Sequence, residues 1–393
     1  MIEPGNEISK HAKDVSWASF NNCPAVKVIT GGKHFRAPVR FNYQAHILRA
    51  MIDGKVSNFP QNDGDGRKPQ FFTLIGTEEA FHGLGWEVIV MCAEDIDRVG
   101  GYPTVMMNQV DFQGVNKENI HLAKAMFDGY GDALKQAGLI NITGETAIMG
   151  KTITAFCDTG DAGQLILTWN GSCLGLAPED GRLLDGSGIK SVMPIVGLWE
   201  PAQRCNGNGF FIRLFLDLVG GDVKKLRQSQ EVLNIARKLC VPSQSYSRTV
   251  TRLLGWTPDG RLGEPLAKIH GIAHITGGGL WEKLGDLLPP NVGAKLDKMP
   301  RPAEVLLECQ KLSLEGRGGE RLTDWKAHSI LHGGCGKVMV CETEEDANTA
   351  VLEARKDGVD AYIIGETVSD PNKIITVNSR FLQGRTIYSN KPE

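Results

Sequence analysis

Three consecutive glycines, Gly277–Gly279, follow a short apolar run and precede a helical pattern. The run Ile272–Ile275 has the composition of a strand, and the pattern after the glycines places Trp281, Leu284 and Leu288 on one helical face. An ordered glycine costs roughly 0.5–1 kcal/mol relative to alanine in regular structure, so three in succession need a reason. The sequence predicts a strand, a glycine loop and a helix, in that order.

The predicted loop has the chemistry of an anion site. Amides in the first turn of a helix lack partners within the helix, and the positive end of the helix dipole lies beside them. Thr276 adds a hydroxyl group at the start of the loop. The alternative is a flexible tight turn, and His274 taken alone is more often a structural histidine than a catalyst. We favour a phosphate-handling loop.

Composition limits the class of protein. With 393 residues and 41% hydrophobic content, the chain has enough apolar side chains for two cores. The formal charge of -3 gives no field that would attract nucleic acid as a main partner. The nine cysteines contain no Cys-x-x-Cys pair and indicate reduced thiols. Met1–Gly5 does not resemble a signal peptide, and no apolar run approaches the ~20 residues that span a bilayer. We expect a soluble cytoplasmic protein with no membrane partner.

The first half of the chain predicts a mixture of strands and helices. Short apolar runs indicate three buried strands, at Gln70–Ile75, Val88–Cys92 and Val105–Val110. Before them, Gln61–Pro69 is rich in turn-forming residues and predicts a solvated loop. A helical repeat runs from Asn116 to Gly138, and this glycine suits the left-handed end of a helix. A strand at Leu139–Ile142 then leads Thr143–Thr146 into a turn.

The second half begins after turn signals between about residues 176 and 190, where we place a domain boundary. Beyond it, the pattern predicts a strand at Val192–Leu198 and one helix that runs from a cap at Asp222 to Pro242.

The C-terminal part predicts a β-α-β unit. Its pieces are a strand at Lys337–Cys341, a helix capped by Thr343 and closed by Gly358, and a strand at Ala361–Ile364. The predicted class is α/β (α+β). The predicted organisation is a divergent N-terminal extension over residues 1–65, an N-terminal domain over 66–185 and a C-terminal domain over 190–393.

A second group of candidate functional residues is acidic. Carboxylates follow the predicted N-terminal strands at Glu78, Glu79, Glu94, Asp95, Asp111 and Glu145. Hard oxygen ligands near phosphate groups are what magnesium needs. A single acid is more often solvated or a helix cap, but Asp95 and Glu145 adjoin short apolar runs that hold them near the end of a sheet. We favour these two as functional carboxylates.

A third candidate is the glycine-containing segment Arg204–Gly209, which follows the predicted strand at Val192–Leu198. Its glycines either admit a ligand or turn the chain, and both interpretations stay open. The sequence contains no Gly-x-x-x-x-Gly-Lys-Ser/Thr, no His-Glu-x-x-His and no Gly-x-Ser-x-Gly motif. A Walker loop is therefore absent.

Several stretches together resemble aminoimidazole ribonucleotide synthetase. The longest, Gly271–Glu282 followed by Leu287–Pro289, is similar to that family's glycine-rich signature. Three others resemble the family's metal-nucleotide segment, its Gly-Glu-Thr-Ala turn and its closing β-α-β unit: Val90–Asp95 with Gly100–Pro103, Gly144–Ala147, and Gly336 through Ala361–Glu366. The resemblance covers about residues 70 to 370 in the family's order.

The resemblance implies a fold, an assembly and a reaction. The fold is a two-domain synthetase fold, in which an N-terminal dimerising β-sheet or barrel domain carries helices and the C-terminal domain is layered α+β. Family members are homodimers that bind nucleotide near the interface. The reaction is a cyclo-ligation in purine biosynthesis with ATP and Mg2+ as cofactors. ATP phosphorylates the amide oxygen of formylglycinamidine ribonucleotide, an internal amine attacks, and phosphate leaves to give aminoimidazole ribonucleotide.

The resemblance also implies roles for matched positions. The implied catalytic residues are Asp95, Glu145 and His274. The implied magnesium ligands are Asp95 and Glu78, and the implied ATP contacts are Glu78, Asp95, Glu145, Asn206 and Gly207. The residues implied to hold the substrate or transferred phosphate are Thr276, Gly277, Gly278 and Gly279.

The match departs from the family pattern in several places, among them the family's Asn-Asp pair, which is Glu94-Asp95 here, and the Asn after the Glu of the glycine motif, which is Lys283. The family's Gly-Thr-Asp-Gly-Val-Gly-Thr-Lys segment is matched to Gly76–Gly83, where Glu78 takes the acidic position and the lysine has no counterpart. The family's His-Ser-Asn-Gly element is matched by Arg204–Gly207.

Rival functions come from the same superfamily. Selenophosphate synthetase needs an early reactive cysteine, but Cys23 lacks a glycine-rich setting. The hydrogenase-maturation relative needs a C-terminal cysteine, whereas this sequence ends in Lys391-Pro392-Glu393. Thiamine-monophosphate kinase stays an alternative. So does a non-catalytic homologue that keeps the phosphate loop and has lost the use of ATP.

Overall fold

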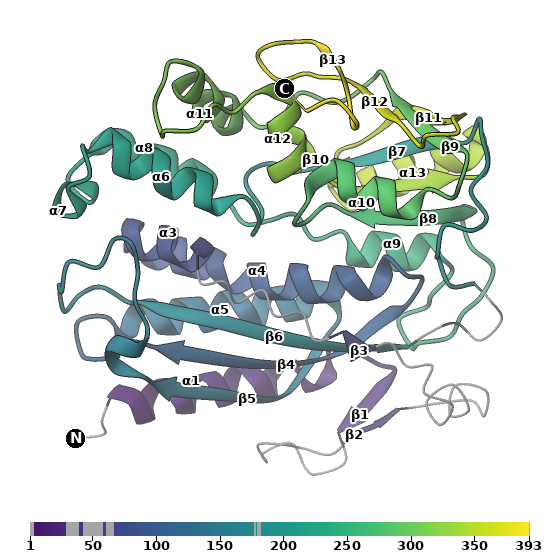
Figure 1. Ribbon diagram of the computed structural model, residues 1–393. Coiled ribbons are helices and arrows are strands. Elements are labelled where there is room, and N and C mark those ends of the chain that lie inside the picture. Colours follow the sequence, from purple (N-terminus) through teal and green to yellow (C-terminus); the bar gives the residue numbers. More distant parts are fainter. Residues whose placement is uncertain are drawn as a thin grey trace.

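A computed structural model describes residues 4–28, 39–41, 58–59, 67–176, 178 and 182–392 of the chain. Within these residues two larger sheets define two units, and Figure 1 shows the N-terminal unit beneath the C-terminal one. The N-terminal sheet has the order β3-β6-β4-β5, and the C-terminal sheet has the order β13-β12-β9-β11-β7-β10-β8. The predicted α/β two-domain fold is confirmed, while the predicted domain limits stay predictions.

The N-terminal sheet is mixed. Its central strand β4 (Tyr102–Phe112) runs parallel to β5 (Ile140–Ile148) and antiparallel to β6 (Leu167–Leu176). A short strand, β3 (Asn58–Phe59), pairs with the other side of β6. Another short pair, β1 (Val26–Val28) with β2 (Val39–Phe41), forms a separate hairpin-like sheet.

Helices α4 (Glu78–Asp97) and α5 (Ile120–Ala137) cover one face of the N-terminal sheet (Figure 1). Two glycines let these helices touch backbone to backbone. A Cβ at Gly129 would lie 1.8 Å from the carbonyl oxygen of His82, and one at Gly85 would lie 2.2 Å from the amide of Tyr130. Helix α1 (Pro4–Ala18) and the short helix η1 (Ser19–Asn21) pack beside α5 and β5, so this part of the predicted extension belongs to the N-terminal unit.

Two predicted strands are wrong. Gln70–Ile75 lies in helix α3 (Arg67–Ile75), and Val88–Cys92 lies in α4. An uninterrupted apolar run does not distinguish a buried strand from a helix that is buried on all sides. Helix α4 is such a helix, buried on all sides, because β6, α5 and α9 (Ser247–Leu253) all pack on it. Of the predicted loop at 61–69, residues 61–66 lie outside the described residues and 67–69 begin α3.

The next three predictions had mixed outcomes. The strand at Val105–Val110 is confirmed within β4, and the helix before Gly138 is confirmed as α5, with this glycine at a left-handed φ of 70°. The predicted turn at Thr143–Thr146 is wrong, because these residues continue β5 in parallel register with β4. A short 3-10 helix, η2 (Gly150–Thr152), follows instead.

The C-terminal sheet is largely antiparallel. Its strands are β7 (Pro194–Trp199), β8 (Ile269–His274), β9 (Val292–Leu296), β10 (Cys335–Cys341), β11 (Ala361–Ser369), β12 (Ile375–Asn378) and β13 (Thr386–Tyr388). Alternate residues face two different cores. Val196 packs toward α9 and α13 (Glu344–Lys356), whereas Ile195 packs toward α10 (Gly279–Leu287).

Most predictions for this unit are confirmed. The predicted β-α-β ending is β10, α13 and β11, and Thr343 forms a capping box with Asp346. The predicted helix from Asp222 to Pro242 is wrong, because Asp222 caps only the short α7 (Val223–Leu226). The side chain of Ser229 accepts a hydrogen bond from the amide of Val232 and starts a second helix, α8 (Gln230–Leu239).

A helical layer connects the two units. Helices α6 (Asn208–Leu218), α8, α11 (Glu304–Leu314) and α12 (Asp324–Ile330) share one hydrophobic core with α3 and α4. Phe71 of α3 meets Phe211 and Phe215 of α6 edge-on in this core. All nine cysteines are free thiols, as predicted, and the structure places all of them in buried positions. Among the described residues, no helix is both long and apolar enough to cross a membrane.

Candidate functional site

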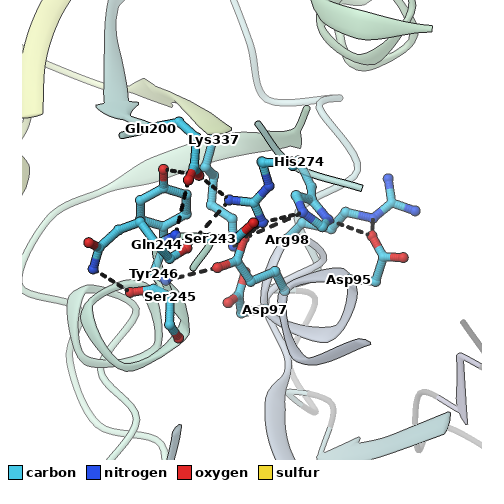
Figure 2. Close-up of polar contacts among 12 residues, drawn as sticks. Asp95, Asp97, Arg98, Glu200, Ser243, Gln244, Ser245, Tyr246, His274 and Lys337 are labelled. Carbon is cyan, nitrogen blue, oxygen red and sulfur yellow. Dashed lines mark hydrogen bonds and ion pairs between the residues drawn. The ribbon is translucent and has the colours of Figure 1, made fainter. Parts of the chain in front are cut away.

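The last turns of α4 bring three acids into the junction between the units. Glu94, Asp95 and Asp97 are buried, with 0%, 4% and 0% of their surface exposed. Buried carboxylates need positive partners or hydrogen-bond donors. Here the partners come from the C-terminal unit, except for Arg98, which directly follows α4 (Figure 2). We call the resulting cluster the junction network, and its members are Glu94, Asp95, Asp97, Arg98, Glu200, Arg204, Tyr246, His274 and Lys337.

Arg204 is the centre of the junction network. Its Nη2 donates to Glu94 Oε2 at 2.9 Å and its Nη1 donates to Glu200 Oε2 at 2.6 Å. Tyr246 completes this group, because its amide donates to Glu94 Oε1 at 2.8 Å and its hydroxyl donates to Glu200 Oε2 at 2.8 Å. Burial by itself raises the pKa of Glu94, but Lys337, Arg204 and His274 outweigh that effect and lower it. Glu94 is therefore a carboxylate held between cations.

His274 has both ring nitrogens in contact with protein groups. Arg204 Nη2 lies 3.1 Å from His274 Nε2, and an arginine can only donate, so Nε2 is the acceptor. The proton is then on Nδ1, which donates to Asp95 Oδ1 at 3.0 Å. Burial lowers the pKa of His274, although Asp95 acts against that shift. His274 is thus a neutral side chain that positions Asp95 and Arg204.

Asp95 is engaged from two sides. Besides His274, Arg98 Nε lies 3.1 Å from Asp95 Oδ1. Burial raises the pKa of Asp95, but the hydrogen bond from His274 and the charge of Arg98 lower it overall. In Figure 2, dashed lines join Asp95 to both of these side chains.

Lys337 and Asp97 form the other end of the junction network, with an ion pair between Nζ and Oδ1. Both side chains have no exposed surface. Burial raises the pKa of Asp97 to about 7, with Lys337 opposing the shift. Four carboxyl groups of the network face three cations, Arg98, Arg204 and Lys337. Burial also raises the pKa of Glu200, so the excess negative charge is relieved by proton uptake at Asp97 and Glu200 rather than at Glu94 or Asp95.

A second buried cluster centres on Lys68 at the start of α3. Its Nζ lies 2.8 Å from Glu87 Oε1 and also donates to the carbonyl oxygen of Gln203. Ser243 donates its hydroxyl to Glu87 Oε2 at 2.7 Å, and Cys205 Sγ lies 3.4 Å from the same oxygen. Burial lowers the pKa of Lys68, but the charge of Glu87 outweighs it and raises the pKa overall. Lys68 is a fully charged lysine beside the Arg204–Gly209 segment.

The predicted strand, glycine loop and helix are confirmed as β8, residues 275–278 and α10. Gly278 caps α10 with a φ of 88°, and Gly279 has a φ of 62°. A Cβ at Gly279 would lie 2.2 Å from the carbonyl oxygen of His328 at the end of α12. Helix α12 thus presses on the loop, and only glycine fits there.

The Arg204–Gly209 segment borders the glycine loop. A Cβ on Gly277 would lie 3.4 Å from Oδ1 of Asn206. Gly207 has a left-handed φ of 80°, and a Cβ there would also lie 2.4 Å from the carbonyl oxygen of Ile330 of α12. Besides Arg204 Nε, three buried polar atoms of this region lack a hydrogen-bond partner among the described residues: Gln203 Oε1, Asn206 Nδ2 and Asn208 Oδ1. Buried polar atoms are normally satisfied, so their side chains are available to a ligand.

The structure therefore joins some of the predicted site residues. Asp95 contacts His274, and Thr276–Gly279 lies beside Asn206 and Gly207. Glu78 and Asp95 do not meet, because they stand at opposite ends of α4, roughly 25 Å apart at about 1.5 Å per residue. Glu78 is exposed in the first turn, which Thr77 caps. Among the described residues, no group of three or more His, Cys, Asp or Glu side chains is arranged to hold a metal ion.

Glu145 also lies apart from the junction network. It is exposed on β5, in register with the exposed Gln109 of β4, on the sheet face opposite α4 and α5. Gly171 of β6 identifies the covered face, because a Cβ there would meet Val88 and Cys92 of α4. Glu145 thus lies on a face that the described helices leave open.

Sequence reasoning missed Lys68, Glu87, Glu200 and Lys337. For Lys68 a signal exists, since Asp63-Gly64-Asp65-Gly66-Arg67-Lys68 repeats the Asp-Gly-x-Gly-x-Lys spacing that ends the family segment. Residues 63–66 lie outside the described residues, but Lys68 itself is buried beside the Arg204–Gly209 segment. We therefore reassign the family segment from Gly76–Gly83 to Asp63–Lys68, and the lysine has a counterpart after all.

The fold and its junction define a two-unit α/β protein in which the Arg204–Gly209 segment borders a glycine loop at a helix start and lies beside a buried lysine and a charged interdomain network. Models of two domains match it: AIR synthase related protein, N-terminal domain, over residues 51–175, and AIR synthase related protein, C-terminal domain, over residues 261–378. The chain belongs to the AIR synthase related superfamily.

Curated relatives support this membership. A phosphoribosylformylglycinamidine cyclo-ligase of Nitrosococcus oceani is 26% identical over 369 residues, which cover 93% of this chain and 89% of the relative. A protein of the same name from Sorangium cellulosum is 28% identical over 78% of this chain and 79% of its own length.

Solved structures share the fold. The hydrogenase maturation protein HypE in complex with ATP superposes with a TM-score of 0.52 at 17% identity, over 79% of each chain. The thiamine-monophosphate kinase of Stenotrophomonas maltophilia superposes with a TM-score of 0.51 at 14% identity, over 88% of this chain and 89% of its own. At these identities the likeness concerns the fold alone.

Proposed function

We propose that the protein is an ATP-dependent cyclo-ligase that converts formylglycinamidine ribonucleotide to aminoimidazole ribonucleotide. The observation that carries this proposal is the glycine loop of Thr276–Gly279 beside Asn206, with unsatisfied polar atoms around it. The names and extent of the curated relatives point to the same reaction.

The loop is suited to a phosphate group of the substrate or the phosphate being transferred. The amide of Gly279 already donates to the carbonyl oxygen of Thr276, so the donors for a phosphate would be the other amides at the start of α10 and the hydroxyl of Thr276, and the helix dipole favours negative charge. Asn206 adds an amide whose Nδ2 has no partner among the described residues. Transfer of a phosphoryl group depends mainly on such positioning and charge neutralisation.

The buried residues fit ATP better than they fit an isolated metal ion. Lys68 supplies a cation near the Arg204–Gly209 segment, where a phosphate would compete with Glu87 for its Nζ. Magnesium bound with the nucleotide would neutralise phosphate charge and would need carboxylate ligands. Asp95 is one candidate, and the reassigned segment adds Asp63 and Asp65 as further candidates.

A homodimer is part of the proposal. The open face of the N-terminal sheet presents the half-buried side chains of Thr168, Asn170 and Ser172 on β6, together with the exposed Gln109 and Glu145. A second copy seated on this face would carry Glu145 toward the partner's nucleotide. Sedimentation velocity tests this point. We expect a dimer that Ser172→Arg converts to monomer while the exposed control Lys224→Glu leaves it intact, and a wild-type monomer would contradict the assembly.

The activity test is direct. Purified protein is incubated with formylglycinamidine ribonucleotide, ATP and Mg2+, and product is followed as aminoimidazole ribonucleotide and as released phosphate. We expect one phosphate for each imidazole formed. Folded protein that forms no imidazole under these conditions would contradict the proposed reaction.

The engagement of Asp95 and His274 by protein groups favours a second candidate, a non-catalytic homologue that binds a phosphorylated ligand. Titration calorimetry with ATP and Mg2+ separates the two, because no heat at millimolar nucleotide would support the non-catalytic role. If ATP binds but the cyclo-ligase substrate does not react, thiamine monophosphate is the next acceptor to test, given the shared fold with its kinase.

A further inference from the structure

A cavity of about 300 Å³ lies at a different part of the junction, between the end of α5 and helix α9. Its described lining comes from both units and from the segment after η1: Asn22, Pro24, Tyr102, Lys135, Gln136, Ala137, Gly138, Arg248, Thr251, Arg252, Trp256 and Pro258. None of these residues belongs to the glycine loop or to the junction network. The volume is at the lower end of the range for sites of small organic molecules.

The charge of this lining has one sign. Lys135, Arg248 and Arg252 are cationic, and the described lining contains no aspartate or glutamate. Arg252 is neutralised by ion pairs with Glu353 and Asp357. In contrast, neither the ammonium of Lys135 nor the guanidinium of Arg248 forms a hydrogen bond or close ion pair with any described residue, although the charge of Arg248 contributes to lowering the pKa of Asp357.

A larger cavity of about 390 Å³ near β8 shows the difference, because Asp185, Glu264 and Glu342 line it together with basic residues. Because the lining of the larger cavity carries charges of both signs, it favours neither an anionic nor a cationic ligand. The lining of the smaller cavity favours an anion.

One wall of the smaller cavity is flat and aromatic. The rings of Tyr102 and Trp256 stack with centroids 5.5 Å apart and an interplanar angle of 23°. Their polar ends are already used, since Tyr102 Oη donates to the carbonyl oxygen of Pro258 at 3.0 Å and Trp256 Nε1 donates to that of Gly100 at 2.9 Å. What these two side chains offer a ligand is therefore apolar ring surface.

Amide groups complete the polar side. Asn22 and Gln136 carry side-chain amides that make no hydrogen bond within the described part of the chain. Thr251 contributes no donor, because its hydroxyl donates to the carbonyl oxygens of Ser247 and Arg248 in its own helix. The cavity thus presents two unpaired cations and two amides opposite an apolar wall.

We propose that this cavity binds a small organic anion in which a phosphate or carboxylate is attached to a flat ring. The anion is held by Lys135 of α5 and Arg248 of α9, and the ring packs on the Tyr102 and Trp256 wall. Because Lys135 belongs to the N-terminal unit and Arg248 to the C-terminal unit, the bound anion links the two units. The site is separate from the proposed ATP and substrate site, and the inference does not depend on the cyclo-ligase activity.

The test uses phenyl phosphate and benzoate as probes, with the full-length protein and titration calorimetry. We expect at least one probe to bind, and Lys135→Gln and Arg248→Gln each to weaken that probe by about tenfold or more, since each removes one charge-assisted hydrogen bond. Lys224→Gln on α7 is the matched exposed control, and Thr276→Val tests the glycine loop; both should leave probe affinity unchanged. Melting curves check that all four variants are folded.

Inorganic phosphate measures the contribution of the ring. The proposal expects it to bind at least about tenfold more weakly than phenyl phosphate, because it buries no apolar surface. A crystal soaked with 4-bromophenyl phosphate should show the bromine against the Tyr102 and Trp256 wall. Equal affinity for phosphate and phenyl phosphate, unchanged affinity in Arg248→Gln, or bromine located only at the glycine loop would each overturn the proposal.

Discussion

His274 and Asp95 meet across the junction of the two units, with Nδ1 of the histidine 3.0 Å from Oδ1 of the aspartate. One residue ends a strand of the C-terminal sheet and the other lies in the last turn of the helix that covers the N-terminal sheet. The contact fixes the tautomer of the histidine, because Arg204 donates to its other nitrogen. The glycine loop begins two residues after His274, so the pair sets the position of the loop relative to α4.

We predict that Asp95→Asn lowers the proposed cyclo-ligase rate by roughly a hundredfold, because small displacements of reacting groups have effects of that size. The fold should persist, since an asparagine Oδ1 still accepts the hydrogen bond from His274. Initial rates and a circular dichroism melt measure the two parts. Near-normal turnover in the folded variant would remove Asp95 from the mechanism.

We predict that Arg204→Met lowers the free energy of unfolding by about 3–5 kcal/mol, because it leaves Glu94 and Glu200 buried without their main cation. Arg213→Met is the control. Its ion pair with Glu320 is largely exposed, and such pairs contribute about 1 kcal/mol or less. Urea denaturation of both variants provides the comparison. Equal losses of unfolding free energy in the two variants would mean that the buried ion pairs contribute no more to stability than the exposed one.

Asp97 predicts a pH dependence of stability. Its pKa is raised to about 7 in the folded protein from an ordinary value of 3.8, so between these values the folded state binds more protons than the unfolded state. Its contribution to stability is therefore present below about pH 4 and is lost as the pH rises toward 7. Relative to Asp97→Asn, the wild type should lose up to about 1.4 kcal/mol per pH unit in this window. Denaturation at several pH values checks the slope, and parallel curves would contradict it.

Substitution by alanine should have opposite effects on stability at two glycines of α10. Gly279→Ala should destabilise the protein by at least about 1–2 kcal/mol, because residue 279 has a left-handed backbone and its Cβ would collide with the carbonyl oxygen of His328. Gly285→Ala should be neutral or stabilise by up to about 1 kcal/mol, since its Cβ has ordinary contacts and alanine favours a helix. Thermal melts measure both effects. A Gly279→Ala variant as stable as Gly285→Ala would show that the loop tolerates a side chain.

The sequence predicted elements wherever local signals determine them. Gly138, Thr343 and Gly277–Gly279 mark ends or starts of helices through cap chemistry, and the structure confirms all of them. Helix α4 was misassigned because its burial comes from partners far away in the chain, which erase the amphipathic pattern.

The candidate site was predicted in part for the same reason. The glycine loop, Asp95 and the Arg204–Gly209 segment stand out locally, whereas Lys337 became visible only through its contact with Asp97, which lies 240 residues away in sequence. Lys68 lies in a readable Asp-Gly-x-Gly-x-Lys run, but Gly76–Gly83 carries a competing partial match to the same family segment.

The position of α4 between the two units has an evolutionary consequence. Its acids Glu94 and Asp97 belong to one domain, but their cations Arg204 and Lys337 belong to the other. If recombination between paralogues exchanged only one domain, buried charges would lose their partners on both sides of the junction. The two halves must therefore be inherited together, and substitutions at the end of α4 should covary with substitutions on β10 and before α6.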